Sequence, residues 1–453
     1  MARIIFSTVS GLPNSSKLPC FYEGFTAALA REGNEVLVII NNKFIKNHWG
    51  NNKTKKNVYK KKLSQEIMNF NPDLVITANN SLYEEIPNLV TCPIVIYCTD
   101  SPSGFVDRDI LKDNIGRYHI FLPSETLIPM TREYFGYDMK CLEILQYATD
   151  FQAEAIDQDK NISFIGTNFS FVGDKFRSTF NGKFHDQKYK ADFIKFINLF
   201  KKDVLRKPDA YLAELGLAPD FLGSISHIEL LNLFSSNFRI QTLAAIADLD
   251  LSLYGRKNWY NVCDYSLDTS LSFVDQEVSS VLDNQNIYNS SKVSINISHS
   301  QAGTAFSWRV RDVMACNSAL VSDHREDIMT EFGKYVKIPT FTNPFDARIL
   351  CQKLLSDEVW RKEIVAGSQL SIEEGHRFKH RIKDVQDILG ITLLNDSKKG
   401  SLKFLNPDDF FLLPTLSQKL MGKNGPVRVA NRARVNLTRV LKTKMKIKKK
   451  PRL

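Results

Sequence analysis

Polar residues in the stretch 288–333 have the spacing of a phosphate-binding loop. A β-branched run at Lys292–Ile297 ends in a polar loop at Ser298–Thr304, and a helical pattern at Phe306–Cys316 precedes another short strand at Ala319–Ser322. Such a βαβ unit places the loop at the carboxyl edge of a parallel sheet, where the N-terminus of the helix faces any ligand. Because the first backbone N–H groups of a helix lack partners within it, they attract anions, most often phosphate. The spacing therefore predicts an anion-binding loop.

The elements that must position this loop indicate an α/β protein. The chain opens with a strand at Arg3–Val9, a loop that holds Gly11, a helix at Phe21–Arg31 and a second strand at Glu35–Ile40. Further strands are expected in the first half at 73–77, 94–98, 118–122 and 141–144. Strands that alternate with helices at this spacing are typical of a doubly wound parallel sheet.

The same pattern then predicts a second α/β domain. A polar hinge is expected at 150–160. The strands expected after it lie at 162–165, 249–254, 292–297, 319–322 and 335–338, and the helices at 238–247, 344–355 and 359–389. Residues 169–237 show helical patterns without a convincing strand, which indicates an inserted helical subdomain. We therefore expect domains at 1–157 and 158–390 and an extension at 391–453.

Composition narrows the class of protein. The chain has 453 residues, of which 43% are hydrophobic, and no apolar run approaches the roughly 20 residues that span a bilayer. The first residues enter a strand without the features of a signal peptide, so we expect a cytoplasmic protein. The seven cysteines show no CxxC spacing, and the histidines form no constellation with Cys or Asp. No metal site is therefore expected.

A basic tail accounts for the net charge of +10. Residues 423–453 contain twelve Lys or Arg and no acid, so the rest of the chain is close to −2. Such a tail could lie on an anionic membrane, where each cation contributes on the order of 1 kcal/mol. It could instead bind an acidic protein acceptor or remain solvated. Nucleic-acid binding is not expected, because neither interleaved aromatic residues nor a folded module accompanies the charge.

Several short motifs stand in a characteristic order along the chain. In the second half they are Ser163–Thr167, Leu253–Gly255 with Trp259, Ile287–Asn289 with Asn296, Arg309–Cys316 with Val321–Asp323, and Glu374, His376, Phe378 and Arg381. In the first half they are Pro72–Ile76, Thr99–Pro102 and Ala148–Asp150. This order resembles the CgeB-type (spore maturation protein) glycosyltransferases, a bacterial group of the GT-B class. The resemblance covers about residues 1–390 apart from the insertion. It implies two Rossmann-like domains that face a cleft.

The resemblance also implies a hexosyltransferase-like activity with the nucleotide-sugar donor mainly on the second domain. No acidic DxD-type pair stands in a suitable loop, so the leaving nucleoside diphosphate would be met by cations and helix-terminal amides rather than by a metal. Arg256 and Lys257 follow a strand and are expected at the same sheet edge as loop 298–304, although they could instead be solvated surface charges. The expected donor-binding residues are Gly11, Gly255, Arg256, Lys257, His299, Gly303, Thr304, Arg309 and, as a ribose contact, Asp312.

The first domain would then supply the acceptor side of the reaction. An inverting transfer needs a general base, and Asp100, in a turn that follows a buried strand, is the expected one. The alternative is that Asp100 only caps its turn. No cofactor is expected beyond the nucleotide-sugar co-substrate. The expected acceptor is a bacterial surface glycan, a lipid-linked molecule or a protein, reached in the cytoplasm or at the inner face of the cytoplasmic membrane.

Two positions depart from the family pattern. Asp312 stands where the family has Glu, and Asn317 stands where it has Gly. Aspartate is one methylene shorter for a ribose contact, whereas asparagine tolerates the left-handed backbone expected at a helix C-cap. These departures leave two alternatives open: a catalytically degenerate binding protein with the GT-B fold, or a GT-B nucleotide-sugar epimerase.

Overall fold

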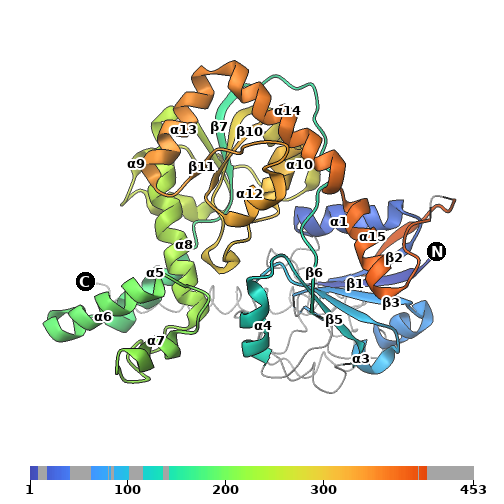
Figure 1. Ribbon diagram of the computed structural model, residues 1–453, viewed down its shortest axis with the longest axis horizontal. Coiled ribbons are helices and arrows are strands. Elements are labelled where there is room, and N and C mark those ends of the chain that lie inside the picture. Colours follow the sequence, from blue (N-terminus) through green and yellow to red (C-terminus); the bar gives the residue numbers. More distant parts are fainter. Residues whose placement is uncertain are drawn as a thin grey trace, which may run out of the picture.

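Two parallel α/β sheets form the frame of the protein (Figure 1). This computed structural model describes residues 1–8, 18–40, 63–79, 81–82, 86–100, 116–135, 142–395 and 397–405. The predictions on Gly11 and on the basic tail at 423–453 lie outside these residues. The doubly wound two-domain class expected from the sequence is confirmed, because both sheets are parallel throughout and carry helices on their faces.

The first sheet has the strand order β12-β2-β1-β3-β4-β5-β6. Its strands are β1 (Arg3–Thr8), β2 (Glu35–Ile40), β3 (Leu74–Ala78), β4 (Ile94–Tyr97), β5 (Tyr118–Leu122), β6 (Leu142–Ile144) and β12 (Ser401–Leu405). Its helices are α1 (Cys20–Arg31), a helix at 63–70, α3 (Ile86–Leu89), α4 (Leu127–Phe135) and α15 (Phe378–Leu389). The five inner strands are buried on both sides because each face of the sheet is covered, one by α1 and α15 and the other by α4 and the helix at 63–70, whereas the edge strands β12 and β6 are more exposed.

The second sheet has the strand order β11-β10-β9-β7-β8, so β9 is central and β8 is an edge strand. Its strands are β7 (Lys160–Ile165), β8 (Leu251–Tyr254), β9 (Ser291–Asn296), β10 (Ala319–Asp323) and β11 (Thr340–Phe341). Its helices are α8 (His227–Ala244), α9 (Leu267–Leu271), α10 (Val281–Asn289), α11 (Arg309–Met314), α12 (Glu326–Phe332), α13 (Pro344–Ser356) and α14 (Glu358–Gly375). The strand predicted at 335–338 is wrong: those residues have no regular structure, and the only pairing nearby is β11 with β10.

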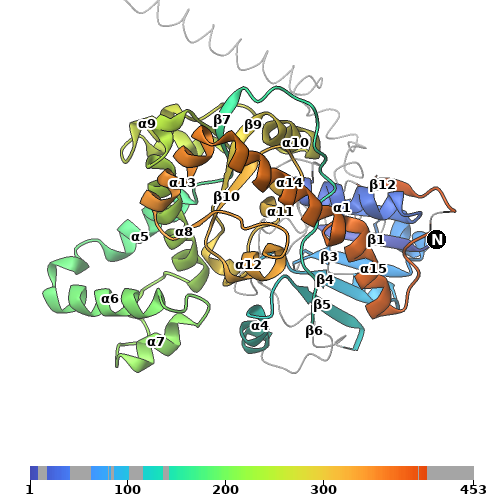
Figure 2. The same cartoon turned by 45° about the horizontal axis from the view of Figure 1, so that its top comes forward.

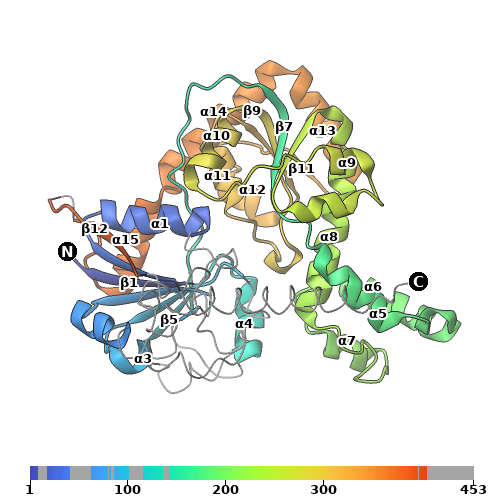
Figure 3. The same cartoon turned by 180° about the vertical axis from the view of Figure 1, so that it is seen from behind.

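The insertion after β7 is helical, as predicted. It contains α5 (Gly173–Phe180), α6 (Gln187–Phe200) and α7 (Pro208–Glu214), and it leads directly into α8. Figures 2 and 3 show these helices projecting from the second domain. They pack on a separate core of aromatic and aliphatic side chains, among them Phe193, Phe196 and Phe200. The insertion therefore has a hydrophobic core of its own.

Within its described residues, the chain crosses between the domains twice. The first crossing follows β6, and the second is the break between α14 and α15 at His376 and Arg377. A single helix had been predicted over 359–389, with a domain boundary at 390. The structure differs, because Phe378 and Ile382 of α15 are buried in the core of the first domain and β12 pairs with β2. The described residues 378–395 and 397–405 thus belong to the first domain. None of the described helices is long and apolar enough to cross a membrane.

Candidate functional site

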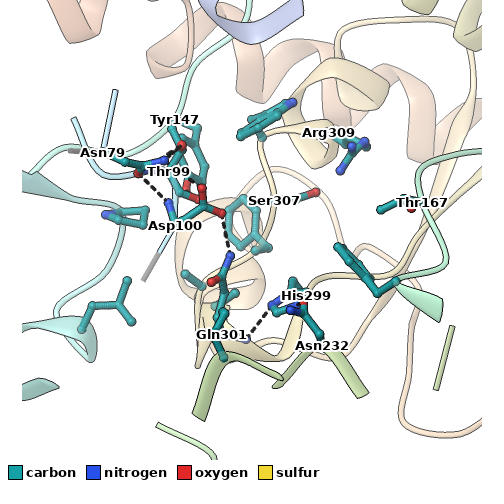
Figure 4. Close-up of a pocket in the computed structure, with 18 of the residues that line it drawn as sticks. Asn79, Thr99, Asp100, Tyr147, Thr167, Asn232, His299, Gln301, Ser307 and Arg309 are labelled. Carbon is teal, nitrogen blue, oxygen red and sulfur yellow. Dashed lines mark hydrogen bonds between the residues drawn. The ribbon is translucent and has the colours of Figure 1, made fainter. Parts of the chain in front are cut away.

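A cavity of about 520 Å³ lies between the two domains (Figure 4). The first domain contributes residues that follow β3, β4 and β5, and the second contributes residues that follow β7 and β9, together with one face of α8. Both walls are thus built from the carboxyl ends of parallel strands, where ligands of open α/β sheets bind. Three predicted site residues line the cavity: Asp100, His299 and Arg309.

Asp100 is the carboxylate on the wall of the first domain. Asn79, which follows β3 and has a left-handed backbone (φ +53°), accepts the backbone N–H of Asp100 at 2.9 Å and donates from its Nδ2 to Asp100 Oδ2 at 2.8 Å. From the second domain, Gln301 Nε2 donates to Asp100 Oδ1 at 2.7 Å. The carboxylate is accessible from the cavity, but the surrounding protein removes bulk water, which raises its pKa, while the bonds from Gln301 and Asn79 lower the pKa.

Arg309 is the first residue of α11 and faces the cavity from the other wall. Within the described part of the chain its guanidinium forms no ion pair, and it lies 5.7 Å from the centre of the Trp308 ring. Trp308 in turn stacks on Phe21 of the first domain, with ring centres 5.2 Å apart. The packing of Trp308 therefore fixes the backbone from which Arg309 extends.

Arg239 of α8 is a second cation at the cavity, and the sequence analysis missed it. It is 3% exposed and donates to the backbone carbonyls of Thr167 and Ile297, which follow β7 and β9. Burial, followed by the charge of Arg309, lowers the pKa of Arg239 to about 9, so it stays protonated at neutral pH. No carboxylate forms an ion pair with Arg239 among the described residues. Two neighbouring cations that form no ion pair with a described carboxylate favour an anionic ligand.

His299 lies in the loop after β9 but is not a third cation. Its Nδ1 accepts the backbone N–H of Gln301 at 3.2 Å, so Nε2 carries the proton and donates to Asn232 Oδ1 at 2.9 Å. Burial, together with the charges of Arg239 and Arg325, lowers the pKa of His299 to about 3. The neutral ring therefore holds the loop against α8.

Gly303 and Thr304 form a contact between the domains. Gly303 has φ +62°, and a Cβ there would lie 2.7 Å from Leu205 Cδ1 of the insertion and 3.3 Å from Thr126 Oγ1 of the first domain. The hydroxyl of Thr304 shares hydrogen bonds with Thr126 at 3.0 Å and Ser124 at 3.2 Å, both in the first domain. The loop after β9 thus touches the first domain at its middle as well as at Trp308.

The structure does not bring Gly255, Arg256 and Lys257 to this cavity. They follow β8, the edge strand, where Gly255 has φ +153° and Trp259 Nε1 donates to Gly166 O at 2.8 Å. Lys257 pairs with Asp275 at 2.9 Å, and its side chain is 76% exposed. The sequence order of strands could not reveal that this loop lies away from the cavity.

Asp312 and Asn317, the two departures from the family pattern, also lie off the cavity. Asp312 is 3% exposed and bonds to Thr149 at the first crossing, and burial raises its pKa to about 7. Asn317 does not have the left-handed backbone that was expected. Its side chain instead donates to the carbonyl of Glu154, and its backbone N–H bonds to Asn289 Oδ1 at 3.0 Å. Both residues therefore support the joint between the domains.

The cavity residues that sequence reasoning missed had weak signals. Arg239 is a lone cation in an apolar helical pattern, and Asn79 directly follows a buried strand. Trp308 and Gln301 lie within the stretch that was predicted to bind an anion, but nothing in their spacing separated them from loop residues. Among the described residues, no group of His, Cys, Asp or Glu is placed to hold a metal ion.

Residues 237–387 match the family model described as "Glycosyl transferase-like". The match begins within α8 and ends within α15. It contains Arg239 and the cavity residues of the loop after β9, including His299, Gln301 and Arg309. The second domain is therefore glycosyltransferase-like, and it supplies the cationic wall of the cavity. No curated protein matches the chain.

Several solved structures share the arrangement of the chain at low identity. HepE from Anabaena in complex with UDP is 12% identical, with 86% of this chain and 99% of that chain covered and a TM-score of 0.42. Sucrose-phosphate synthase from Thermosynechococcus elongatus is 11% identical, with 86% and 98% covered and a TM-score of 0.47. T4 phage BGT in complex with UDP and Mn²⁺ is 10% identical, with 86% and 99% covered and a TM-score of 0.48. Likeness at this level carries no inference about activity.

Proposed function

We propose that this chain is a GT-B glycosyltransferase that moves a sugar from a nucleotide-sugar donor to an acceptor held in the cavity between its domains. The observation that carries the proposal is Arg309, a cation without an ion-pair partner among the described residues, at the cavity and inside the glycosyltransferase-like region. The opposite wall presents the Asp100 carboxylate. The cavity thus offers positive charge to a leaving group on one side and a base to a nucleophile on the other.

In this proposal the second domain stabilises the charge that develops on the donor. As the bond between the sugar and the diphosphate breaks, negative charge accumulates on the phosphate oxygens. A guanidinium can donate paired hydrogen bonds to such oxygens, and no described carboxylate pairs with Arg309 in competition. Arg239 is held by two carbonyls and adds its positive field from beneath the loop. Gly303, Thr304 and His299 shape the loop that carries Arg309.

Asp100 is the proposed general base of the transfer. It would accept the proton of an acceptor hydroxyl while that oxygen attacks the anomeric carbon and the nucleoside diphosphate departs. A pKa that lies above the ordinary carboxyl value, but is restrained by the bonds from Asn79 and Gln301, suits this task. Asp312 is not included among the donor contacts, because it is buried away from the cavity.

We further propose a metal-independent reaction of the CgeB subtype. Arg309 and Arg239 already supply two positive charges beside the expected diphosphate, which is the electrostatic task that a divalent cation performs in other transferases. Turnover should therefore be unchanged in EDTA. A rate that falls in EDTA and returns with Mg²⁺ or Mn²⁺ would contradict metal independence without affecting the proposed transfer.

The acceptor proposed from the sequence is a surface glycan, a lipid-linked molecule or a protein. The twelve cations of 423–453 support an acceptor near an anionic membrane. Sedimentation with anionic vesicles should carry the full chain down and leave a chain that ends at Gly422 in solution. Equal sedimentation of both would remove the membrane from the proposal.

A panel of nucleotides tests the proposed function directly. Thermal unfolding with UDP, GDP, CMP and TDP should show stabilisation by at least one, and the corresponding nucleotide-sugar should then be consumed. Asp100→Asn should keep the nucleotide-induced shift and lose about 100-fold or more in turnover, because it removes the base alone. Absence of any shift across the panel would contradict the proposal.

A binding protein without catalysis is the second candidate, and the position of Asp312 favours it, because the residue expected to contact the ribose faces the joint between the domains. In that case a nucleotide would stabilise the chain, but neither the wild type nor Asp100→Asn would consume any nucleotide-sugar.

A further inference from the structure

The Asp100 carboxylate is held from both domains at once. Asn79, from its own domain, donates to Oδ2 at 2.8 Å, and Gln301, from the second domain, donates to Oδ1 at 2.7 Å (Figure 4). The two donors therefore satisfy one oxygen each. Separation of the domains would break the bond from Gln301 and leave the bond from Asn79 intact.

The backbone on both sides of Gln301 is fixed to the second domain. Ser300 N donates to Ser235 Oγ of α8 at 2.8 Å, and the Gln301 backbone N–H donates to His299 Nδ1 at 3.2 Å. His299 is bonded to Asn232, again on α8. The side chain of Gln301 is thus the part of this short turn that reaches across the cavity. The Gln301 side chain therefore moves with the second domain. Arg309 lies eight residues further along the chain, at the start of the helix that follows the same loop.

Within the described part of the chain, the amides of Gln301 and Asn79 are the groups that lower the pKa of Asp100. The titratable side chains on which the Asp100 charge acts are Tyr22 of α1, Cys98 after β4 and Tyr147 at the first crossing. All three are neutral at pH 7, since burial raises the pKa of each thiol or phenol. No cation pairs with Asp100 among the described residues. Among the described groups, the two amides are therefore the ones whose hydrogen bonds lower the pKa of Asp100.

We propose that Gln301 is a positioning residue for the reaction proposed above: it ties the donor-binding loop to Asp100, so that the base is oriented for the transfer when the two domains meet. The catalytic role of Gln301 rests on the proposed function. The hydrogen bond between Gln301 and Asp100 can be tested without measuring turnover. Gln301 acts through Asp100 and does not touch the reacting atoms.

Carbon-13 NMR of the aspartate carboxyl groups tests the bond. With the Asp100 signal assigned from its loss in Asp100→Asn, the full chain is titrated as wild type, Gln301→Met and Gln301→Glu. Methionine keeps the length of the side chain but cannot donate a hydrogen bond. Loss of the donor should raise the pKa of Asp100 by about half a unit to one unit, a modest change because the carboxylate is partly solvated. Glu places a second carboxylate beside Asp100 and should raise the pKa further. Gln241→Met, on the exposed side of α8, is the matched control and should leave it unchanged.

Donor turnover is measured on the same variants across pH. The acidic limb of the rate profile should move to higher pH in Gln301→Met and Gln301→Glu, with the nucleotide-induced thermal shift retained. An unchanged Asp100 pKa in both variants would overturn the inference. Turnover whose acidic limb lies at the same pH in the variants as in the wild type would also overturn it. If the Asp100 pKa shifts but the chain consumes no nucleotide-sugar, the hydrogen bond from Gln301 is supported and the proposed function is contradicted. Gln301 would then have no role in catalysis.

Discussion

Two loops leave the carboxyl edge of the second sheet and were both predicted to bind the donor. The loop after β9 crosses to the first domain at Gln301, Thr304 and Trp308 and ends in Arg309 at the cavity. The loop after β8 turns back into its own domain, where Trp259 is fully buried and Lys257 is paired at the surface. The first loop is shaped by its contacts with the other domain, and the second by the interior of its own.

The position of each strand in its sheet explains this difference. Strand β9 is central, so its loop emerges beside the first domain, whereas β8 is at the edge. A Gly followed by two cations looks the same after either strand, because the sequence shows where a strand ends but not where it lies in the sheet. Charge after a strand is therefore evidence for a site only once the strand order is known.

The largest effect expected from this comparison is on stability, in the loop after β8. Trp259 is fully buried, and its Nε1 bonds to Gly166 O at 2.8 Å. Trp259→Ala should lower the free energy of unfolding by about 3–5 kcal/mol, measured by urea denaturation. Trp360→Ala on α14, where the indole is only partly buried, is the matched control and should lower the free energy of unfolding by clearly less. Equal losses would show that the loop after β8 is not held by its tryptophan.

A smaller effect is expected at Asp312, which follows the loop after β9 but faces the joint between the domains. Burial raises its pKa from 3.8 to about 7, so between these values the folded chain keeps a proton that the unfolded chain releases. Stability therefore falls as pH rises through this window, by up to about 1.4 kcal/mol per pH unit. Asp312→Asn cannot ionise and should gain stability over the wild type between pH 5 and 8.

Urea titrations at both pH values measure this gain. A constant difference between the variant and the wild type at pH 5 and 8 would contradict the raised pKa. Nucleotide affinity should stay within about twofold of the wild type, because the carboxylate lies off the cavity; a larger loss would restore Asp312 as a donor contact.

The smallest effect is expected at Lys257. Its ion pair with Asp275 is exposed, and such pairs are screened by solvent. Lys257→Ala should change neither the unfolding midpoint nor the affinity for nucleotide, as measured by calorimetry. A weakened affinity would return the loop after β8 to the donor site.

Much of the fold could be predicted from local patterns. Most strands of the two sheets are runs of buried apolar residues, and these were placed within a few residues. The exception among the predicted strands is 335–338, where a β-branched run near Val336 packs without pairing. The return of α15 and β12 to the first domain was missed. The local sequence does not show this return, because an apolar residue such as Phe378 could be buried in the core of either domain. The break of the helix at Arg377 directs α15 to the first domain.

The candidate site was predictable in part. Asp100, His299 and Arg309 stood out because polar residues directly follow buried strands or open a helix. Arg239 was hidden because its role depends on two carbonyls 72 and 58 residues away along the chain. The neutral state of His299 was equally hidden, since it results from neighbours that only the fold assembles.

Calorimetric titration of nucleotide into matched arginine variants tests the central claim most directly. Arg309→Ala and Arg256→Ala remove the same charge from the loops after β9 and β8. The account predicts that Arg309→Ala weakens binding of the nucleoside diphosphate by about 10- to 100-fold, the cost of hydrogen bonds to a charged group. Arg256→Ala should bind within about twofold of the wild type. Equal affinity in Arg309→Ala and the wild type, or a greater loss in Arg256→Ala, would contradict the assignment of the donor site to the loop after β9.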